Sequence, residues 1–104
     1  MHRETKATSI PPRVKAAVMA RDGGLCVICK RPGLPNAHVV RRSQGGRGIP
    51  ENIVCLCPSC HRAYDEGRPE ERERAYVRIV VHLNGFYPGW NRSDMTYKKW
   101  LNED

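Results

Sequence analysis

Hydrophobic residues recur at helical spacing near the start of the chain, after a polar lead-in without any such period. The recurring positions are Val14, Ala17 and Val18. Ser9 can cap a helix that contains them, and a glycine pair after Asp22 can end it. We therefore expect a disordered lead-in over residues 1–8 and a helix over residues 9–22.

A second apolar stripe lies in the C-terminal half, at Ala75, Tyr76, Ile79, Val80 and Leu83. It predicts a helix from Pro69 to Leu83, which Asn84-Gly85 stops. The aromatic stretch that follows is expected to end in a short helix from Ser93 to Leu101. Residues 69–104 would then form a helical extension of the domain.

Between these helices the pattern changes to short apolar runs and glycine-rich turns. Val39-Val40, directly after His38, predicts a strand, and Ile49 to Leu56 predicts the returning strand of a hairpin. The loop between them contains Gly45, Gly46 and Gly48, and we expect it to be flexible. Cys57 through Glu66 then predicts a short helix. The middle of the chain is thus expected to form two strands followed by a helix.

Two Cys-x-x-Cys pairs bracket the predicted hairpin. Their members are Cys26, Cys29, Cys57 and Cys60. Four thiolates complete the tetrahedral shell of a closed structural zinc site, which leaves no open position for chemistry. The fifth cysteine, Cys55, makes the count odd, and we interpret it as a small core residue. These features predict a zinc-clamped core over residues 25–67 in a reducing compartment, and argue against a disulfide-rich secreted scaffold.

The composition fits one small, metal-stapled domain. The chain has 104 residues, of which 39% are hydrophobic and 7% aromatic, so its core is modest and a metal would help to hold it. The N-terminus has no long apolar run typical of a secretory signal, and no stretch is long enough to span a bilayer. We therefore expect a cytoplasmic protein without a membrane partner.

The charge balance favours a polyanionic partner. Lysine and arginine number 18 against 11 acids, for a formal net charge of +7. Arg41, Arg42 and Arg47 lie between the two cysteine pairs and are candidate DNA-binding residues. The alternative for each arginine is a solvated surface charge without a partner.

Zinc leaves three polar residues inside or beside the clamp without a role: His38, Asn52 and His61. A neutral imidazole is suited to take a proton from water near pH 7, so His38 is a candidate general base. His61 can offer a nitrogen to a divalent cation, and Asp65, one helical turn later, can offer an oxygen. Without further context, each histidine would more often be an ordinary structural residue.

The order of these residues resembles that of the HNH endonucleases, and most closely that of small zinc-containing members from phages and prophages. The similarity covers residues 20–68 and rests, in order, on His38, the arginines after it, Gly45-Gly46, Asn52, the second cysteine pair and His61. It implies an α+β fold, a ββα-metal (His-Me finger) core with a structural zinc site and flanking helices. It also implies hydrolysis of DNA phosphodiester bonds with a divalent cation such as Mg²⁺, Mn²⁺ or Ni²⁺.

The resemblance also implies roles for residues, products and partners. His38, Asn52 and His61 would be the catalytic set, in which Asn52 braces the loop that aims the base. The products would carry a 5′-phosphate and a 3′-hydroxyl. DNA would be the substrate, and terminase or portal proteins of a phage would be partners in genome packaging.

One position departs from the family pattern. Many members place an aspartate or a second histidine directly before the base, as a metal ligand, and this chain has Ala37 there. Either Asp65 compensates together with water and phosphate oxygens, or the activity is weak, or the protein is a non-catalytic zinc-stabilised module that binds nucleic acid. We favour the first option. On the predicted strand Arg42 would share the face of His38 and contact phosphate, whereas Arg41 would point away.

Overall fold

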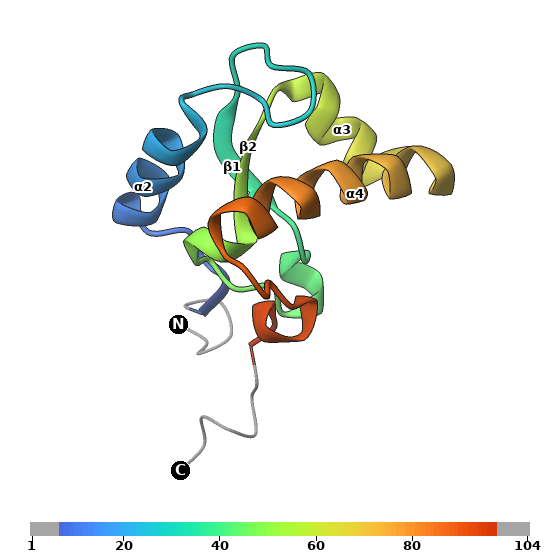
Figure 1. Ribbon diagram of the computed structural model, residues 1–104. Helices are drawn as coiled ribbons and strands as arrows, with labels where there is room; N and C mark the ends of the chain where they lie inside the picture. The colour runs from blue at the N-terminus through green and yellow to red at the C-terminus, as the bar shows by residue number, and fades with distance from the viewer. Residues whose placement is uncertain (1–6, 98–104) are drawn as a thin grey trace.

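The computed structural model describes residues 7–97 and shows a two-stranded sheet enclosed by helices (Figure 1). Helix α2 lies on one side of the sheet, and helices α3 and α4 lie on the other. In chain order the main elements are α2 (Pro12–Asp22), β1 (Leu34–His38), β2 (Ile53–Leu56), α3 (Pro58–Glu66) and α4 (Pro69–Phe86). This is the α+β, ββα arrangement that the sequence predicted.

Strands β1 and β2 pair antiparallel, with Ala37 opposite Val54 and His38 opposite Ile53. Side chains of β1 alternate between exposed and buried, and β2 is buried throughout because helices cover both of its faces. The predicted strand at Val39-Val40 is wrong, since β1 ends at His38. His38 therefore stands at the end of the hairpin, where the chain leaves the sheet.

The segment that returns to the sheet begins with a 3-10 helix, η2 (Pro50–Asn52), and not with a strand. Pairing starts only at Ile53, so the predicted strand from Ile49 was too long. Pro50 has no amide hydrogen to donate to a sheet, which favours a turn at this point.

The connecting loop is packed, contrary to the expected flexibility. It contains a 3-10 helix, η1 (Arg42–Gln44), and its Gly45, Gly46 and Gly48 are all buried. A Cβ atom on Gly46 would overlap the Val40 carbonyl group, so the loop passes where only glycine fits. The backbone of Gly46 also forms a β-bridge with Thr96.

The N-terminal helix is shorter than predicted, because α2 begins after Pro11 and its N-cap has no side-chain hydrogen bond. Gly23, with a φ of 67°, ends it as expected. Ala7 and Thr8 are helical and Thr8 is only 3% exposed, so these two residues do not belong to a disordered lead-in. Residues 1–6 lie outside the described part of the chain.

The C-terminal half differs from the prediction in two places. Helix α4 runs through the expected stop at Asn84-Gly85 and ends at Phe86. The Asn84 side chain donates to the carbonyl oxygen of Val80 one turn earlier, at 3.1 Å, which is compatible with a continuing helix. Where a helix from Ser93 was expected, the chain forms a short 3-10 helix, η3 (Arg92–Met95). The rest of that prediction, residues 98–101, lies outside the described residues.

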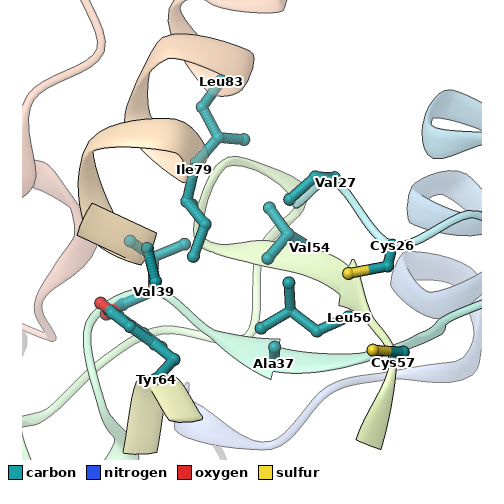
Figure 2. Close-up of a cluster of buried hydrophobic side chains, with 11 residues drawn as sticks. Cys26, Val27, Ala37, Val39, Val54, Leu56, Cys57, Tyr64, Ile79 and Leu83 are labelled. Atoms are coloured by element: carbon teal, nitrogen blue, oxygen red, sulfur yellow. The ribbon is translucent and has the colours of Figure 1, made fainter. Parts of the chain in front are cut away.

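The main core lies between the sheet and α4 (Figure 2). Ile79 and Leu83 of α4 reach toward Val54 and Leu56 of β2. The Tyr64 hydroxyl of α3 donates to the Val39 carbonyl oxygen at 2.6 Å and fixes the chain directly after His38. Among residues 7–97, every helix is too short or too polar to cross a bilayer.

A buried ion network joins α2 to both β2 and α4. The Asp22 carboxylate is fully buried and accepts hydrogen bonds from Arg21 at 2.7 Å, from His82 at 2.7 Å and from the Cys55 amide at 3.0 Å. Burial by itself would raise the pKa of Asp22, but these donors outweigh it and lower the pKa. The network holds α2 in a fixed position against the hairpin that carries His38.

Candidate active site

The four cysteines of the two pairs converge at one end of the core. Their sulfur atoms all lie within 4.8 Å of one another, and those of Cys29 and Cys57 are 3.5 Å apart. A tetrahedral zinc ion, at about 2.3 Å from each sulfur, separates the sulfurs by about 3.8 Å. The cluster therefore fits zinc in both geometry and donor type. Figure 2 shows Cys26 and Cys57 at this end of the core.

Backbone amides favour the thiolate form in this cluster. The amide of Cys29 donates to the Cys26 sulfur at 3.5 Å, and the amide of Cys60 donates to the Cys57 sulfur at 3.4 Å. Burial alone would raise the pKa of Cys26, but backbone donors outweigh it and lower the pKa to about 6. Burial and the neighbouring sulfurs raise the pKa of Cys60. A bound divalent cation would offset the repulsion between the neighbouring sulfurs, because it coordinates all four of them as thiolates.

His38 and His61 line the same cleft, which has a volume of about 290 Å³. His38 comes from the end of β1 and His61 from the first turns of α3, so the hairpin and the helix each supply one imidazole. The other lining residues are Asn36, Arg41, Arg42, Ser43 and Asp65. The cleft therefore combines two arginines with a histidine–carboxylate pair.

The His38 ring is half-buried and makes a hydrogen bond through Nε2, which lies 2.8 Å from the Thr8 carbonyl oxygen. A carbonyl oxygen can only accept, so Nε2 carries the hydrogen and Nδ1 keeps the free lone pair. Burial lowers the pKa of His38, and the charges of Arg42 and His61 act in the same direction. These effects outweigh the Thr8 carbonyl and Asp65, which raise it. His38 is thus neutral at pH 7 and has a nitrogen ready to accept a proton.

If the cleft hydrolyses DNA, as the resemblance implies, the lowered pKa of His38 sets the pH below which the cleavage rate falls. A protonated imidazole cannot accept a proton, so the rate should fall as pH falls through the pKa of His38. Because this pKa lies below the ordinary value of 6.5, the single-turnover rate should be nearly level from pH 8 to pH 7.5 and still exceed half of its plateau at pH 6.5. A rate that already halves between pH 8 and pH 7 would contradict the assignment of His38 as the base.

Asn52 is fully buried and braces the loop that follows His38. Its Oδ1 accepts the Val40 amide at 2.9 Å, and its Nδ2 donates to the carbonyl oxygens of Val40 at 3.2 Å and Arg47 at 2.8 Å. One side chain therefore ties both ends of the loop together. This geometry suits the bracing role that the resemblance implied.

His61 and Asp65 form a candidate cation site on α3. The Nε2 atom of His61 lies 3.2 Å from the Oδ2 atom of Asp65, and both side chains are partly exposed. Two ligands that bind one magnesium ion at right angles, each at about 2.1 Å, are about 3.0 Å apart, so the pair fits. Within the part of the chain that the structure describes, the four cysteines are the one cluster of three or more potential metal ligands. Water and phosphate oxygens would therefore complete the shell.

The arginines are arranged differently from the prediction. Arg41 does not point away: it lines the cleft and donates to the Asp65 carbonyl oxygen at 2.7 Å. Arg42 also lines the cleft, although it lies on η1 and does not share a strand face with His38. Arg47 is exposed and lines a different cleft, beside Tyr87 and Trp90. The positive charge at the two histidines therefore comes from Arg41 and Arg42.

Sequence reasoning missed three residues around the cleft. Asn36 and Ser43 line it, and Thr8 contacts His38. A predicted strand that began before His38, as β1 does, would have identified Asn36, because Asn36 and His38 are alternate residues of one strand and share a face. Ala37 is 1% exposed and packs in the core, so the metal ligand that many family members carry at this position has no counterpart there.

Known proteins are similar to the part of the chain that carries this cleft. Residues 26–67 match the family model described as HNH endonuclease. A type IV methyl-directed restriction enzyme, EcoKMcrA of Escherichia coli (strain K12), is 35% identical to this chain over 80 residues. The match covers 65% of this chain and 29% of that enzyme, so the chain spans less than a third of the relative's length. The chain thus matches the HNH endonuclease family over its residues 26–67.

Proposed function

We propose that this protein is a metal-dependent endonuclease that hydrolyses phosphodiester bonds of DNA. The observation that carries the proposal is the shared cleft, which is lined both by a neutral imidazole and by a histidine–carboxylate pair. The family match supports nuclease chemistry. The relative is named as a restriction enzyme, which supports DNA as the substrate of this chain as well.

In the proposed reaction, the side chains prepare a water molecule for attack on phosphorus. His38 accepts a proton from the water through Nδ1, and the water oxygen forms a bond to phosphorus while the bond from phosphorus to the 3′ oxygen breaks. The departing 3′ oxygen takes up a proton from solvent water and the proton on His38 returns to solvent, which gives a 3′-hydroxyl and a 5′-phosphate. A divalent cation held by His61 and Asp65 would neutralise the phosphate and stabilise the departing oxygen.

Arg41 and Arg42 are the proposed phosphate contacts beside the reaction centre. Contacts to phosphate fix position and supply affinity but do not read bases. We therefore propose cleavage or nicking of double-stranded DNA with low sequence preference. The terminase or portal partner and the phage origin stay predictions from the resemblance.

The test is an assay on supercoiled plasmid with zinc-loaded protein and added Mg²⁺, Mn²⁺ or Ni²⁺. We expect relaxed or linear product with at least one ion, and no product when the ion is left out. Omission is preferable to a chelator, because a chelator would also attack the cysteine cluster. If folded protein binds the plasmid but leaves it intact with all three ions, the nuclease proposal is wrong. The protein would then be a non-catalytic module that binds nucleic acid.

A further inference from the structure

The residues before α2 pack against the loop that carries the cleft arginines. Thr8 is 3% exposed, the Ala7 carbonyl oxygen accepts the Gly48 amide at 3.1 Å, and the Arg42 Nε donates to the Thr8 hydroxyl at 3.4 Å. A Cβ atom on Gly48 would overlap the Ser9 carbonyl, so the two backbones touch at this point. The segment is thus held in place at several points independent of His38.

This held segment supplies the oxygen that faces the His38 ring. The Thr8 carbonyl oxygen lies 2.8 Å from His38 Nε2, 30 residues away in sequence. We propose that the Thr8 carbonyl is a positioning group for the general base, which keeps His38 in the tautomer with its hydrogen on Nε2 and its lone pair on Nδ1. The proposal rests on the proposed function for its catalytic consequence.

The chemical reason is that a neutral imidazole has two tautomers and only one of them can act. When Nε2 carries the hydrogen, Nδ1 can accept a proton from water in the cleft. When Nδ1 carries it, a water beside that nitrogen meets a donor and cannot give up its proton. A fixed carbonyl selects the first tautomer because it stabilises a hydrogen on Nε2 and repels a lone pair there.

Thr8 belongs to a part of the chain that is separate from the ββα core. Thr8 lies outside residues 26–67, the part that matches the family model. The ββα core would therefore hold its base in the active form only together with the chain upstream of α2. The N-terminal segment becomes part of the active site through its backbone.

A change to the backbone tests this without removing any side chain. Cys26 allows the protein to be assembled by ligation of a synthetic peptide of residues 1–25 to the remainder. In the test protein, the bond between Thr8 and Ser9 is an ester, whose carbonyl is a weaker acceptor. In the matched control the ester joins Ser9 to Ile10 and changes the Ser9 carbonyl, which faces Gly48. Thermal unfolding and zinc content confirm that both proteins fold.

Two readouts are compared: the ¹⁵N shifts of the His38 ring and the steady-state constants for DNA cleavage. We expect the unmodified protein and the control to show the Nε2-hydrogen tautomer. The Thr8–Ser9 ester should shift His38 toward a mixture of tautomers and lower kcat by about three- to tenfold, in line with a weakened hydrogen bond, while KM is unchanged. A purely structural contact would alter unfolding without changing the tautomer.

Equal tautomer populations and equal kcat values in the two esters would overturn the proposal, as would an Nδ1-hydrogen tautomer in the unmodified protein. The ring shifts do not depend on cleavage. If the unmodified protein cleaves no DNA, the proposed function fails, and the ring shifts still decide whether Thr8 sets the tautomer of His38.

Discussion

Replacing His38 with alanine is expected to lower the single-turnover rate of DNA cleavage by about 10²- to 10⁴-fold, the usual contribution of a general base. The residue lines the cleft with a free Nδ1, and its Nε2 faces the Thr8 carbonyl. Alanine removes the proton acceptor and leaves the arginines in place, so DNA affinity should change little. Single-turnover cleavage of supercoiled plasmid and a gel-shift titration measure the two quantities.

The His38→Ala result needs a control for the loss of a histidine as such. His2→Ala removes a histidine that lies outside residues 26–67 and should cleave at the wild-type rate. Zinc content and thermal unfolding must match among the three proteins. If both variants cleave as fast as wild type, the assigned base is wrong.

Replacing Cys57 with serine is expected to release the zinc and unfold the domain. The Cys57 sulfur belongs to the four-sulfur cluster, and it also accepts the Cys60 amide at the start of α3. Structural zinc binding is worth about 10–16 kcal/mol in small zinc domains, which is as large as the whole stability of a typical domain, about 5–15 kcal/mol. Zinc analysis together with far-UV circular dichroism measures the effect.

Cys55→Ala is the matched control for Cys57→Ser. Cys55 is buried on β2, and burial raises the pKa of its thiol to about 11, so it is an inert thiol outside the cluster. This variant should keep one zinc per chain and its native spectrum, with a stability loss of about 1 kcal/mol for the smaller side chain. A Cys57→Ser protein that kept one zinc and the native spectrum would contradict the structural role of the cluster.

The sequence predicted the order of elements because strong local signals mark them. The two cysteine pairs locate the clamp, and the apolar stripe of α4 appears as Ile79 and Leu83 in the core. The α2 terminus at Asp22 followed from its glycine pair. These features depend on neighbours within one or two turns, which is the range over which sequence patterns are informative.

The errors lie where distant segments decide the conformation. Val39-Val40 has strand composition, but the bond from Tyr64 and the Asn52 side chain hold this stretch outside the sheet. The glycines of the loop suggested flexibility, yet Gly48 is glycine because Ser9 packs against it. Neither contact leaves a periodic signal in the sequence.

In the candidate site, too, some features could be predicted from the sequence and others depend on distant segments. His38, His61 and Asp65 share one cleft, as their chemistry suggested. The direction of Arg41 was wrong because the prediction extended the strand beyond His38. The contact from Thr8 could not be predicted, because it uses a backbone oxygen and any residue could provide it.

The proposed function depends on one claim, that His38 is the proton acceptor for hydrolysis at the cation site of His61 and Asp65. Its most direct test is cleavage of plasmid by His38→Ala with added imidazole, beside His61→Ala under the same conditions. The claim predicts that imidazole restores cleavage to His38→Ala, in proportion to its neutral form, and restores none to His61→Ala, which lacks a cation ligand. Cleavage by His38→Ala at the wild-type rate without imidazole would contradict it.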